Sequence, residues 1–265
     1  MTEYPDILYV KEGHIATITL NRPDKMNSFS AKMSDSIYRA ISDSAADKKI
    51  RVIILTAKGR AFCAGADVKQ MAQRLDEPGG AERDMVQIDS RTSLYVLMQK
   101  CNKPIIAAVN GVAVGGGLDL ALACDIRIAS DQAKFAEVFV RRGMIPASGG
   151  TYFLPRLVGI DKALLMAWTG DMVDAKEAEQ IGLVTMVVPH DELETATMDL
   201  AEKLAKGPPL AIQHAKRAIY DGLTMDLETN LKMIAPLVKE LNLTQDHKEG
   251  ARAFVEKREP VFRGE

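Results

Sequence analysis

The chain has 265 residues, of which 47% are hydrophobic and 26% charged, and its net charge at pH 7 is −2. This composition is typical of a globular protein with enough apolar material for a sizeable core. A chain so close to neutral, with no strong basic stripe, is not expected to bind nucleic acid or an anionic membrane surface. No stretch approaches the ~18 apolar residues of a membrane-spanning helix.

Cysteine and histidine usage argues against disulfides and metal sites. The three cysteines are odd in number and show no CxxC spacing, which indicates reduced thiols in a cytoplasmic protein. The four histidines are scattered, without an HExxH motif, so no metal site is predicted. The first ten residues, MTEYPDILYV, carry acids where a secretory signal needs basic residues; we therefore expect a cytoplasmic location.

The first half of the chain alternates apolar strand-like runs with helical patterns. The elements predicted here are a β-hairpin over 7–20, a helix over 31–47, a strand over 51–57, a mobile loop over 71–90, a helix over 91–101, a strand over 103–111, a helix over 118–124 and a strand over 125–130. Ser30 can cap the first helix, and the strand over 51–57 is nearly all apolar, as strands buried on both faces are. This alternation predicts parallel βαβ units rather than a sandwich.

From about residue 161 the pattern becomes helical. The predicted helices span 161–170, 174–182, 191–207, 208–222, 226–243 and a last segment over 248–265 that Pro260 stops. Several begin at Asp and end at Gly, in keeping with the capping preferences of helix ends. The sequence thus predicts one α/β core followed by a helical C-terminal region.

Two turns are dense in small residues and are each followed by an acid. They are AFCAGADVKQ, at 61–70, and NGVAVGGGLDLALACD, at 110–125. The first N–H groups of a helix have no partner within the helix, and two such turns brought together could aim two amides at one oxygen, forming an oxyanion hole. The alternatives are close helix–strand packing, or phosphate binding, for which the second turn lacks both the P-loop motif and a clean GxGxxG.

Longer motifs carry a resemblance to a known family. NRPDKMNSFS, GRAFCAGADVKQM, KPIIAAVNGVAVGGGLDLALACDIRIAS, AKFAEVFVRRGMIPASGGTYFLPRLVG, AEQIGLVTMVVP and FVEKREPVF occur in order over nearly the whole chain. Together they resemble the crotonase superfamily, also called the enoyl-CoA hydratase/isomerase family. The resemblance implies a spiral of ββα units over residues 1–200, which binds the acyl-CoA, and a helical trimerisation region over 201–265. It also implies a homotrimer or a hexamer made of two trimers.

The same resemblance implies the substrate and its contacts. The substrate is an acyl-CoA thioester, so coenzyme A is part of the substrate and no separate cofactor is expected. The thioester oxygen is expected between the backbone amides of Ala66 and Gly116. Positions that match the family's coenzyme A contacts are Lys25, Ala64, Ala66, Asp67, Val68 and Lys69, with Phe254 and Lys257 reaching a coenzyme A, often across a subunit boundary.

The acids depart from the family's pattern. A hydratase of this family typically uses two carboxylates placed to move the protons of the added water. Asp119 stands at the first position, one methylene shorter than the usual Glu. Phe139 stands at the second, and Ala147 replaces the Asp that some relatives carry instead.

Three interpretations follow from this departure. Asp119 alone could move a proton between carbons, as in a Δ-isomerase. Another acid could supply the missing function: Glu137, on the face of Phe139 if the strand is extended and about 7 Å from it, or Asp84 or Asp89 closing from the loop over 71–90. Phe139 could instead shape a pocket for a bulky or cyclic acyl group.

The resemblance favours an enoyl-CoA hydratase, with an enoyl-CoA Δ-isomerase or a ring-processing enzyme that relies on Asp119 as the alternative. A non-catalytic acyl-CoA binder is a second alternative, against which the retained Asp119 argues. A serine hydrolase is disfavoured, because Ser148 does not lie in a GxSxG motif and no histidine lies near these motifs. The sequence leaves open the acyl chain, the pathway and the choice between trimer and hexamer.

Overall fold

The N-terminal elements form where the sequence places them. The computed structural model describes residues 3–67, 73 and 94–265. β1 (Ile7–Glu12) and β2 (Ile15–Leu20) pair antiparallel as the predicted hairpin. α1 (Ala31–Ala46) follows, and the Ser30 hydroxyl accepts a 2.9 Å hydrogen bond from the Met33 amide, confirming the predicted cap.

Two sheets make the core of the fold. The larger sheet has the order β1-β2-β3-β5-β7-β10, with β3 (Val52–Ala57), β5 (Ile105–Val109), β7 (Ile126–Ser130) and β10 (Met186–Val188). The smaller sheet has the order β4-β6-β8-β9, with β4 (Ala61–Cys63), β6 (Val112–Val114), β8 (Lys134–Ala136) and β9 (Val173–Asp174). β2, β3, β5, β7 and β10 run parallel to one another.

The chain moves between the two sheets in a repeating way. Each of β3, β5 and β7 lies in the larger sheet, and the next strand, β4, β6 or β8, lies in the smaller one. The smaller sheet pairs β4 with β6 and β6 with β8, all parallel. The repetition of this step confirms the predicted spiral of strand pairs and the α/β class.

The central strands of the larger sheet, β3, β5 and β7, are largely buried on both faces. Along β3, Ile53 and Leu55 belong to the main hydrophobic cluster, which also contains the inward side chains of α1, while Val52 and Ile54 belong to a second cluster. The second cluster is covered by α7 (Leu193–Lys206) through Leu193, Ala201 and Ala205. Full burial of such an aliphatic side chain stabilises the fold by about 1.5–3 kcal/mol, so alternate residues of one strand hold helices on both sides.

α5 (Gly150–Thr169) corrects the predicted helix start at Asp161. The helix begins eleven positions earlier, directly after Gly149, whose φ is 102°. Gly159, at φ 78°, then interrupts the helical backbone. Only the part after this glycine carries a recognisable start signal in the sequence, because the first part opens on a glycine without a side chain to cap it.

The last helices also differ from prediction at their ends. α6 (Ala175–Gln180), α8 (Pro209–Gly222), α9 (Leu227–Leu243) and α10 (Gln245–Glu256) match predicted helices. α10 begins three residues early because Thr244 caps it, and it ends at Lys257, whose left-handed backbone (φ 54°) stops the helix before Pro260 is reached. α7 begins at Leu193 after a short 3-10 turn rather than at Asp191.

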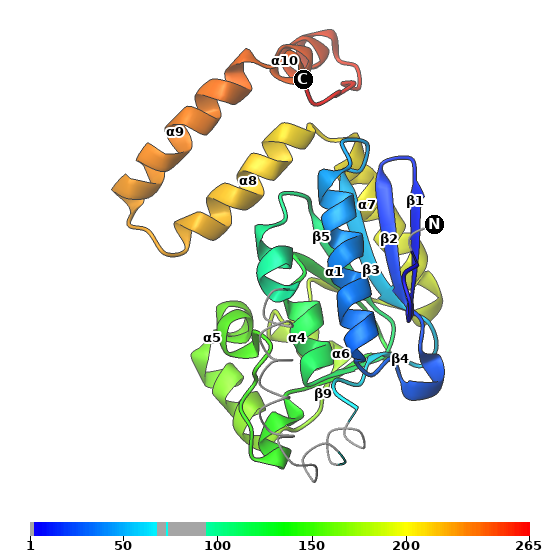
Figure 1. Ribbon diagram of the computed structural model, residues 1–265. Coiled ribbons are helices and arrows are strands. Elements are labelled where there is room, and N and C mark those ends of the chain that lie inside the picture. Colours follow the sequence, from blue (N-terminus) through cyan, green and yellow to red (C-terminus); the bar gives the residue numbers. More distant parts are fainter. Residues whose placement is uncertain (1–2, 68–72, 74–93) are drawn as a thin grey trace.

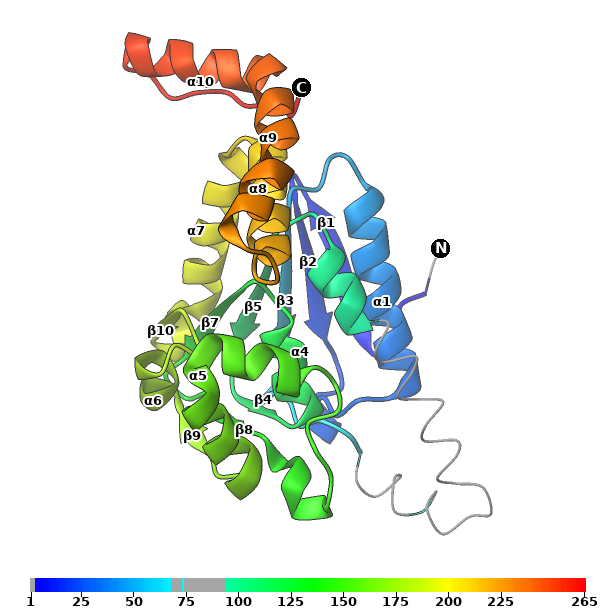
Figure 2. The same ribbon diagram turned by 90° about the vertical axis from the view of Figure 1, so that its left-hand side faces the viewer.

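The C-terminal helices project from the core. In Figures 1 and 2, α8 and α9 form an antiparallel pair that projects to one side of the upper part of the core, and α10 lies above them, while α4 (Gly116–Leu122) and α5 lie in the lower part. Asp125 anchors α8 to the core, since its carboxylate accepts hydrogen bonds from Lys216 Nζ at 2.7 Å and Tyr220 Oη at 2.9 Å. Within the described residues, no helix is long and apolar enough to cross a membrane.

Candidate active site

The two small-residue turns touch each other. A Cβ placed on Gly65 would lie 2.7 Å from Val114 O and 3.3 Å from Gly116 N, and Gly65 itself has a φ of 76°. A Cβ on Gly117 would collide with the Cys63 carbonyl. The turn after β4 therefore packs directly against the start of α4, and glycine is required at this contact because any side chain would separate the two turns.

The amides of interest lie at this contact. Gly116 is the first residue of α4, where backbone N–H groups have no partner within the helix and the helix dipole is positive. Ala66 follows Gly65 and forms a parallel bridge with Phe29. Neither the Ala66 amide nor the Gly116 amide donates a hydrogen bond to a backbone or side-chain atom in the described part of the chain.

The segment around Lys25 runs alongside the first turn. The Ala64 amide donates to Met26 O at 3.0 Å, and the Phe29 amide donates to Gly65 O at 2.8 Å. Lys25 ends the 3-10 helix η1 (Pro23–Lys25) and is exposed, while Asp67 is half-buried. Two further positions expected to contact coenzyme A, Val68 and Lys69, lie outside the described residues.

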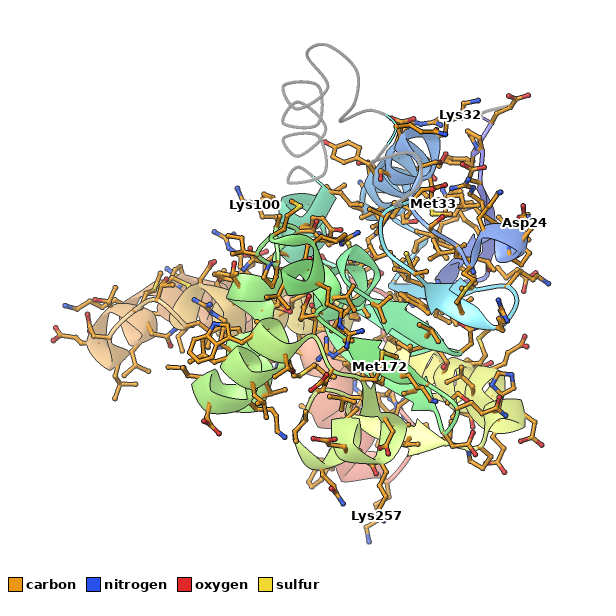
Figure 3. All side chains as sticks on the ribbon, turned by 90° about the horizontal axis from the view of Figure 1, so that it is seen from below. Asp24, Lys32, Met33, Lys100, Met172 and Lys257 are labelled. Carbon is orange, nitrogen blue, oxygen red and sulfur yellow. The ribbon has the colours of Figure 1, made fainter. Side chains whose placement is uncertain are left out.

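Phe254 and Lys257 are not brought to these turns within one chain. Both lie at the end of α10, and Phe254 is 86% exposed. In the views of Figures 1 and 2, α10 and α4 lie far apart, and the Lys257 side chain points outward at the edge of the molecule in Figure 3.

Asp119 and Glu137 meet over Gly150. Asp119 lies on the first turn of α4, Glu137 follows β8, and both side chains are fully buried. A Cβ on Gly150 would collide with Asp119 Oδ1 and lie 2.8 Å from Glu137 Oε1. The Ser148 amide donates to Asp119 Oδ2 at 3.2 Å. Because Gly150, at the start of α5, has no side chain, the two carboxyl groups can occupy the space next to it.

Burial governs the protonation of this pair. Burial raises the pKa of Asp119 well above its ordinary value, although hydrogen bonds from Glu137 and from the Ser148 and Gly150 amides oppose the shift. Burial also raises the pKa of Glu137, and the adjacent negative charge of Asp119 and a hydrogen bond with it raise that pKa further. Two carboxyl groups so close cannot both ionise at low cost. The pair therefore keeps at least one proton through neutral pH, held mainly by Glu137, whose pKa is raised the further of the two.

Phe139 and Glu137 do not share the extended strand assumed from the sequence. β8 ends at Ala136, and Phe139 lies in the 3-10 helix η2 (Val138–Arg142). The phenyl ring lies against the second turn, with a ring carbon 3.7 Å from a Cβ placed on Gly115. The Arg142 guanidinium sits over the ring, 5.7 Å from its centroid. Phe139 is thus an apolar wall beside the turn.

The remaining candidates are less central. Asp84 and Asp89 lie outside the described residues, and Ala147 is half-buried. The ring nitrogens of His14, His190 and His214 face Lys49 O, Ser130 Oγ and Glu240 respectively, which gives no support to a Ser148–histidine pair. No cluster of three metal-binding side chains occurs among the residues that the structure describes.

Sequence reasoning missed the part that Gly150 takes in the site. The SGG stretch that contains it is visible in the sequence as another small-residue turn. However, nothing in its spacing shows that it faces the acid of a helix that starts more than thirty residues earlier. Glu137 was identified only as one option, and its contact with Asp119 depends on the bend where β8 gives way to η2.

Comparisons with known proteins agree with this geometry. The family model described as enoyl-CoA hydratase/isomerase matches residues 10–265. The chain is 40% identical to the putative enoyl-CoA hydratase/isomerase YngF of Bacillus subtilis, over 96% of each chain. It is also 40% identical to the (E)-benzylidenesuccinyl-CoA hydratase of Thauera aromatica, over 95% of this chain and 96% of that protein.

A solved structure of enoyl-CoA hydratase from Bacillus anthracis is 37% identical, with a TM-score of 0.93 over 98% of this chain and 100% of that one. Sequence and fold therefore agree over nearly the full length of the chain. The chain belongs to the enoyl-CoA hydratase/isomerase family, the crotonase superfamily that its motifs resemble.

Proposed function

We propose that the protein is an enoyl-CoA hydratase that adds water across the C2=C3 bond of an enoyl-CoA thioester. The observation that carries this proposal is the buried pair of Asp119 and Glu137 beside two touching turns with free amides. Hydration needs one group that takes a proton from water and one that gives a proton to carbon. A pair holding a single proton offers both, and the Thauera aromatica relative is itself named a hydratase.

In the proposed step, the carboxyl pair of Asp119 and Glu137 gains one proton from water and gives one proton to C2. The water oxygen bonds to C3 while Asp119 takes one water proton, and the C2=C3 electrons move toward the thioester oxygen to give an enolate. The amides of Ala66 and Gly116 hold that oxygen, and each such donor contributes roughly 2.7–4 kcal/mol to the transition state. The pair then carries two protons, one of which goes to C2 and leaves the pair as it began.

Substrate entry requires movement around the acids. Asp119 and Glu137 are each 0% exposed, so the acyl group reaches them only when neighbouring residues shift. Phe139 lines the approach with an apolar face, which suits an acyl chain and favours a bulky or cyclic one. Because the amides and the carboxyl pair supply all the groups of the step, we propose that coenzyme A enters as part of the substrate and that no separate cofactor takes part.

An enoyl-CoA Δ-isomerase is the second candidate function. Phe139 stands where a hydratase of this family typically has its second acid, and proton transfer between C2 and C4 needs only one base. Mass spectrometry distinguishes the two reactions on straight-chain and cyclic 2-enoyl and 3-enoyl-CoA esters. A product heavier by one water supports hydration, whereas migration of the double bond with deuterium entering at C4 supports isomerisation.

Asp119→Asn tests whether the protein is a catalyst at all. The amide keeps the shape of the side chain but accepts no proton, so we expect turnover to fall by about 10²–10⁴-fold, while binding of a saturated acyl-CoA persists. The exposed Asp171→Asn serves as the matched control. A wild-type protein that binds acyl-CoA esters and converts none of them would instead favour the non-catalytic binder.

We also propose that residues 1–200 form the acyl-CoA-binding core and that 201–265 mediate assembly into a trimer or a hexamer of two trimers. α7 continues through residue 200 to Lys206 and packs on the sheet, so the projecting arm itself starts with α8. Its apolar side chains are unusually exposed, as patches of this kind are at interfaces: Ile219, Leu223, Leu227, Leu231, Val238 and Leu243. Leu227→Glu, at 74% exposure, should dissociate the assembly in sedimentation velocity runs.

In such an assembly Phe254 and Lys257 would reach a coenzyme A bound mainly by a neighbouring subunit, beside the segments of Lys25, Ala64 and Asp67. This arrangement accounts for an 86% exposed phenylalanine far from its own turns. We further propose a cytoplasmic location, in keeping with three buried cysteines that form no disulfide. A Lys257→Ala variant should raise KM for the thioester with little change in kcat.

A further inference from the structure

Ser148 has a hydroxyl group without a partner, beside both halves of the proposed site. Its side chain is more than nine-tenths buried, at 8% exposure. Its amide donates to Asp119 Oδ2 at 3.2 Å, yet its Oγ makes no hydrogen bond to any residue that the structure describes. Ser148 Oγ is also not one of the fully enclosed atoms that lack a partner, so the hydroxyl borders space that a small molecule can reach.

The hydroxyl also faces the second turn. A Cβ placed on Gly116 would lie 3.9 Å from Ser148 Oγ and 3.5 Å from a ring carbon of Phe29. The space left by the missing side chain of Gly116 therefore lies between an apolar ring and a hydroxyl. Gly116 also carries one of the two amides proposed to hold the thioester oxygen, so Ser148 Oγ lies near the place where the reacting carbons must sit.

The added water needs a second anchor besides Asp119. Asp119 can accept one of its protons, but a water held by one hydrogen bond alone is poorly oriented for attack on C3. Phe139 cannot supply another hydrogen bond, and in the proposed step Glu137 serves as the source of the proton for C2. A serine hydroxyl can both donate and accept. The Ser148 amide already binds the Asp119 carboxylate, so the Ser148 hydroxyl lies near that carboxylate too. One water can bridge the two groups if their oxygens are no more than about 5.6 Å apart.

We propose that Ser148 is a catalytic residue whose hydroxyl holds the water that adds to C3. This assignment rests on the proposed hydratase function. The hydroxyl then positions the water, a role that a second carboxylate would have at the position occupied here by Phe139. The proton still passes from the water to Asp119 and returns from the pair to C2, so Ser148 neither gains nor loses a proton over the step.

Two reactions of the same site separate this role from a structural one. Hydration of but-2-enoyl-CoA uses the water, whereas exchange of the C2 protons of butyryl-CoA in deuterated water uses only the acids and the two amides. Ser148→Ala should lower kcat for hydration about 10-fold, the value of one neutral hydrogen bond. KM, the pH profile and the C2 exchange rate should stay unchanged. Ser148→Thr, which keeps the hydroxyl, should retain most of the hydration rate.

The outcomes are distinguishable. If Ser148→Ala hydrates as fast as the wild type, or loses hydration and C2 exchange in equal proportion, the hydroxyl does not hold the water and the assignment is wrong. If instead the wild type exchanges protons but hydrates no enoyl-CoA, the hydratase function itself fails, and the assignment to Ser148 fails with it.

Discussion

Glu137 should make the protein lose stability as the pH rises, and Glu137→Gln should remove the part of that loss that Glu137 causes. The carboxyl is fully buried and its pKa is raised by burial and by Asp119, so the folded protein keeps a proton that the unfolded chain releases above about pH 4.3. A raised carboxyl pKa lowers stability progressively from the unfolded pKa up to the folded pKa. Glutamine has no such proton, so the variant keeps only the dependence that comes from Asp119.

The slope sets the magnitude. One proton retained by the folded state costs about 1.4 kcal/mol per pH unit. Between pH 5 and 8, above the unfolded pKa of Glu and below its raised folded value, the difference in unfolding free energy between Glu137→Gln and wild type should grow by about 4 kcal/mol. Urea denaturation at each pH, at one fixed protein concentration, measures this difference.

An exposed glutamate supplies the control. Glu194 is on the surface of α7, and Glu194→Gln serves as the matched control because it leaves the buried pair of carboxyl groups unchanged. A stability profile of Glu137→Gln that runs parallel to that of the wild type would mean that Glu137 ionises normally in the folded protein. The single shared proton, and the proposed proton donor with it, would then be wrong.

Three other changes test separate parts of the structure. Gly150→Ala forces a methyl group against Asp119 Oδ1 and within 2.8 Å of Glu137 Oε1; kcat should fall at least about 10-fold and stability by about 1–3 kcal/mol, and a fully active, equally stable variant would contradict the packing. Lys103→Met removes the ammonium that donates to Ser44 O and Asp47 O, both at 2.6 Å, at the end of α1; urea denaturation should show a loss of about 3 kcal/mol with kcat unchanged. Because burial raises the pKa of Asp119, the acidic limb of the kcat profile should lie well above pH 4, with activity rising as Asp119 ionises, and an ordinary limb near pH 4 would show that Asp119 is not the base.

Much of the fold could be predicted because local signals agree with the packing. Strand β3 is apolar on both faces and is buried on both faces, and Ser30 caps the helix that it precedes. The composition of the two small-residue turns gave their contact only as one possibility, beside helix–strand packing and phosphate binding. At Gly65 and Gly117 the structure supplies the reason, since a side chain there would strike the opposite turn.

The rest depended on distances that no local pattern encodes. Glu137 could be assigned a place only by assuming an extended strand, and the turn into η2 moved Phe139 off that face. The start of α5 was hidden because glycines open and interrupt it. Phe254 and Lys257 gain a role only in an assembly, which a single chain does not contain.

The site joins three segments, and the fold fixes each at a different point. Asp119 comes from α4, Glu137 from the end of β8, and Ser148 and Gly150 from the start of α5. At the far end of α4, the buried Arg127 guanidinium donates to Cys124 O at 2.6 Å and to Leu183 O at 2.8 Å.

A cation at a helix C-terminus stabilises the helix dipole. Arg127 therefore satisfies the carbonyl end of α4, while the proposed function gives the amide end, at Gly116, the task of holding the thioester oxygen. The two ends of this short helix thus differ: the carbonyl end is bonded into the core, and the Gly116 amide donates no hydrogen bond to a described residue. The proposed reaction depends on this rigidity, because a shift of α4 would displace the Gly116 amide and Asp119 together.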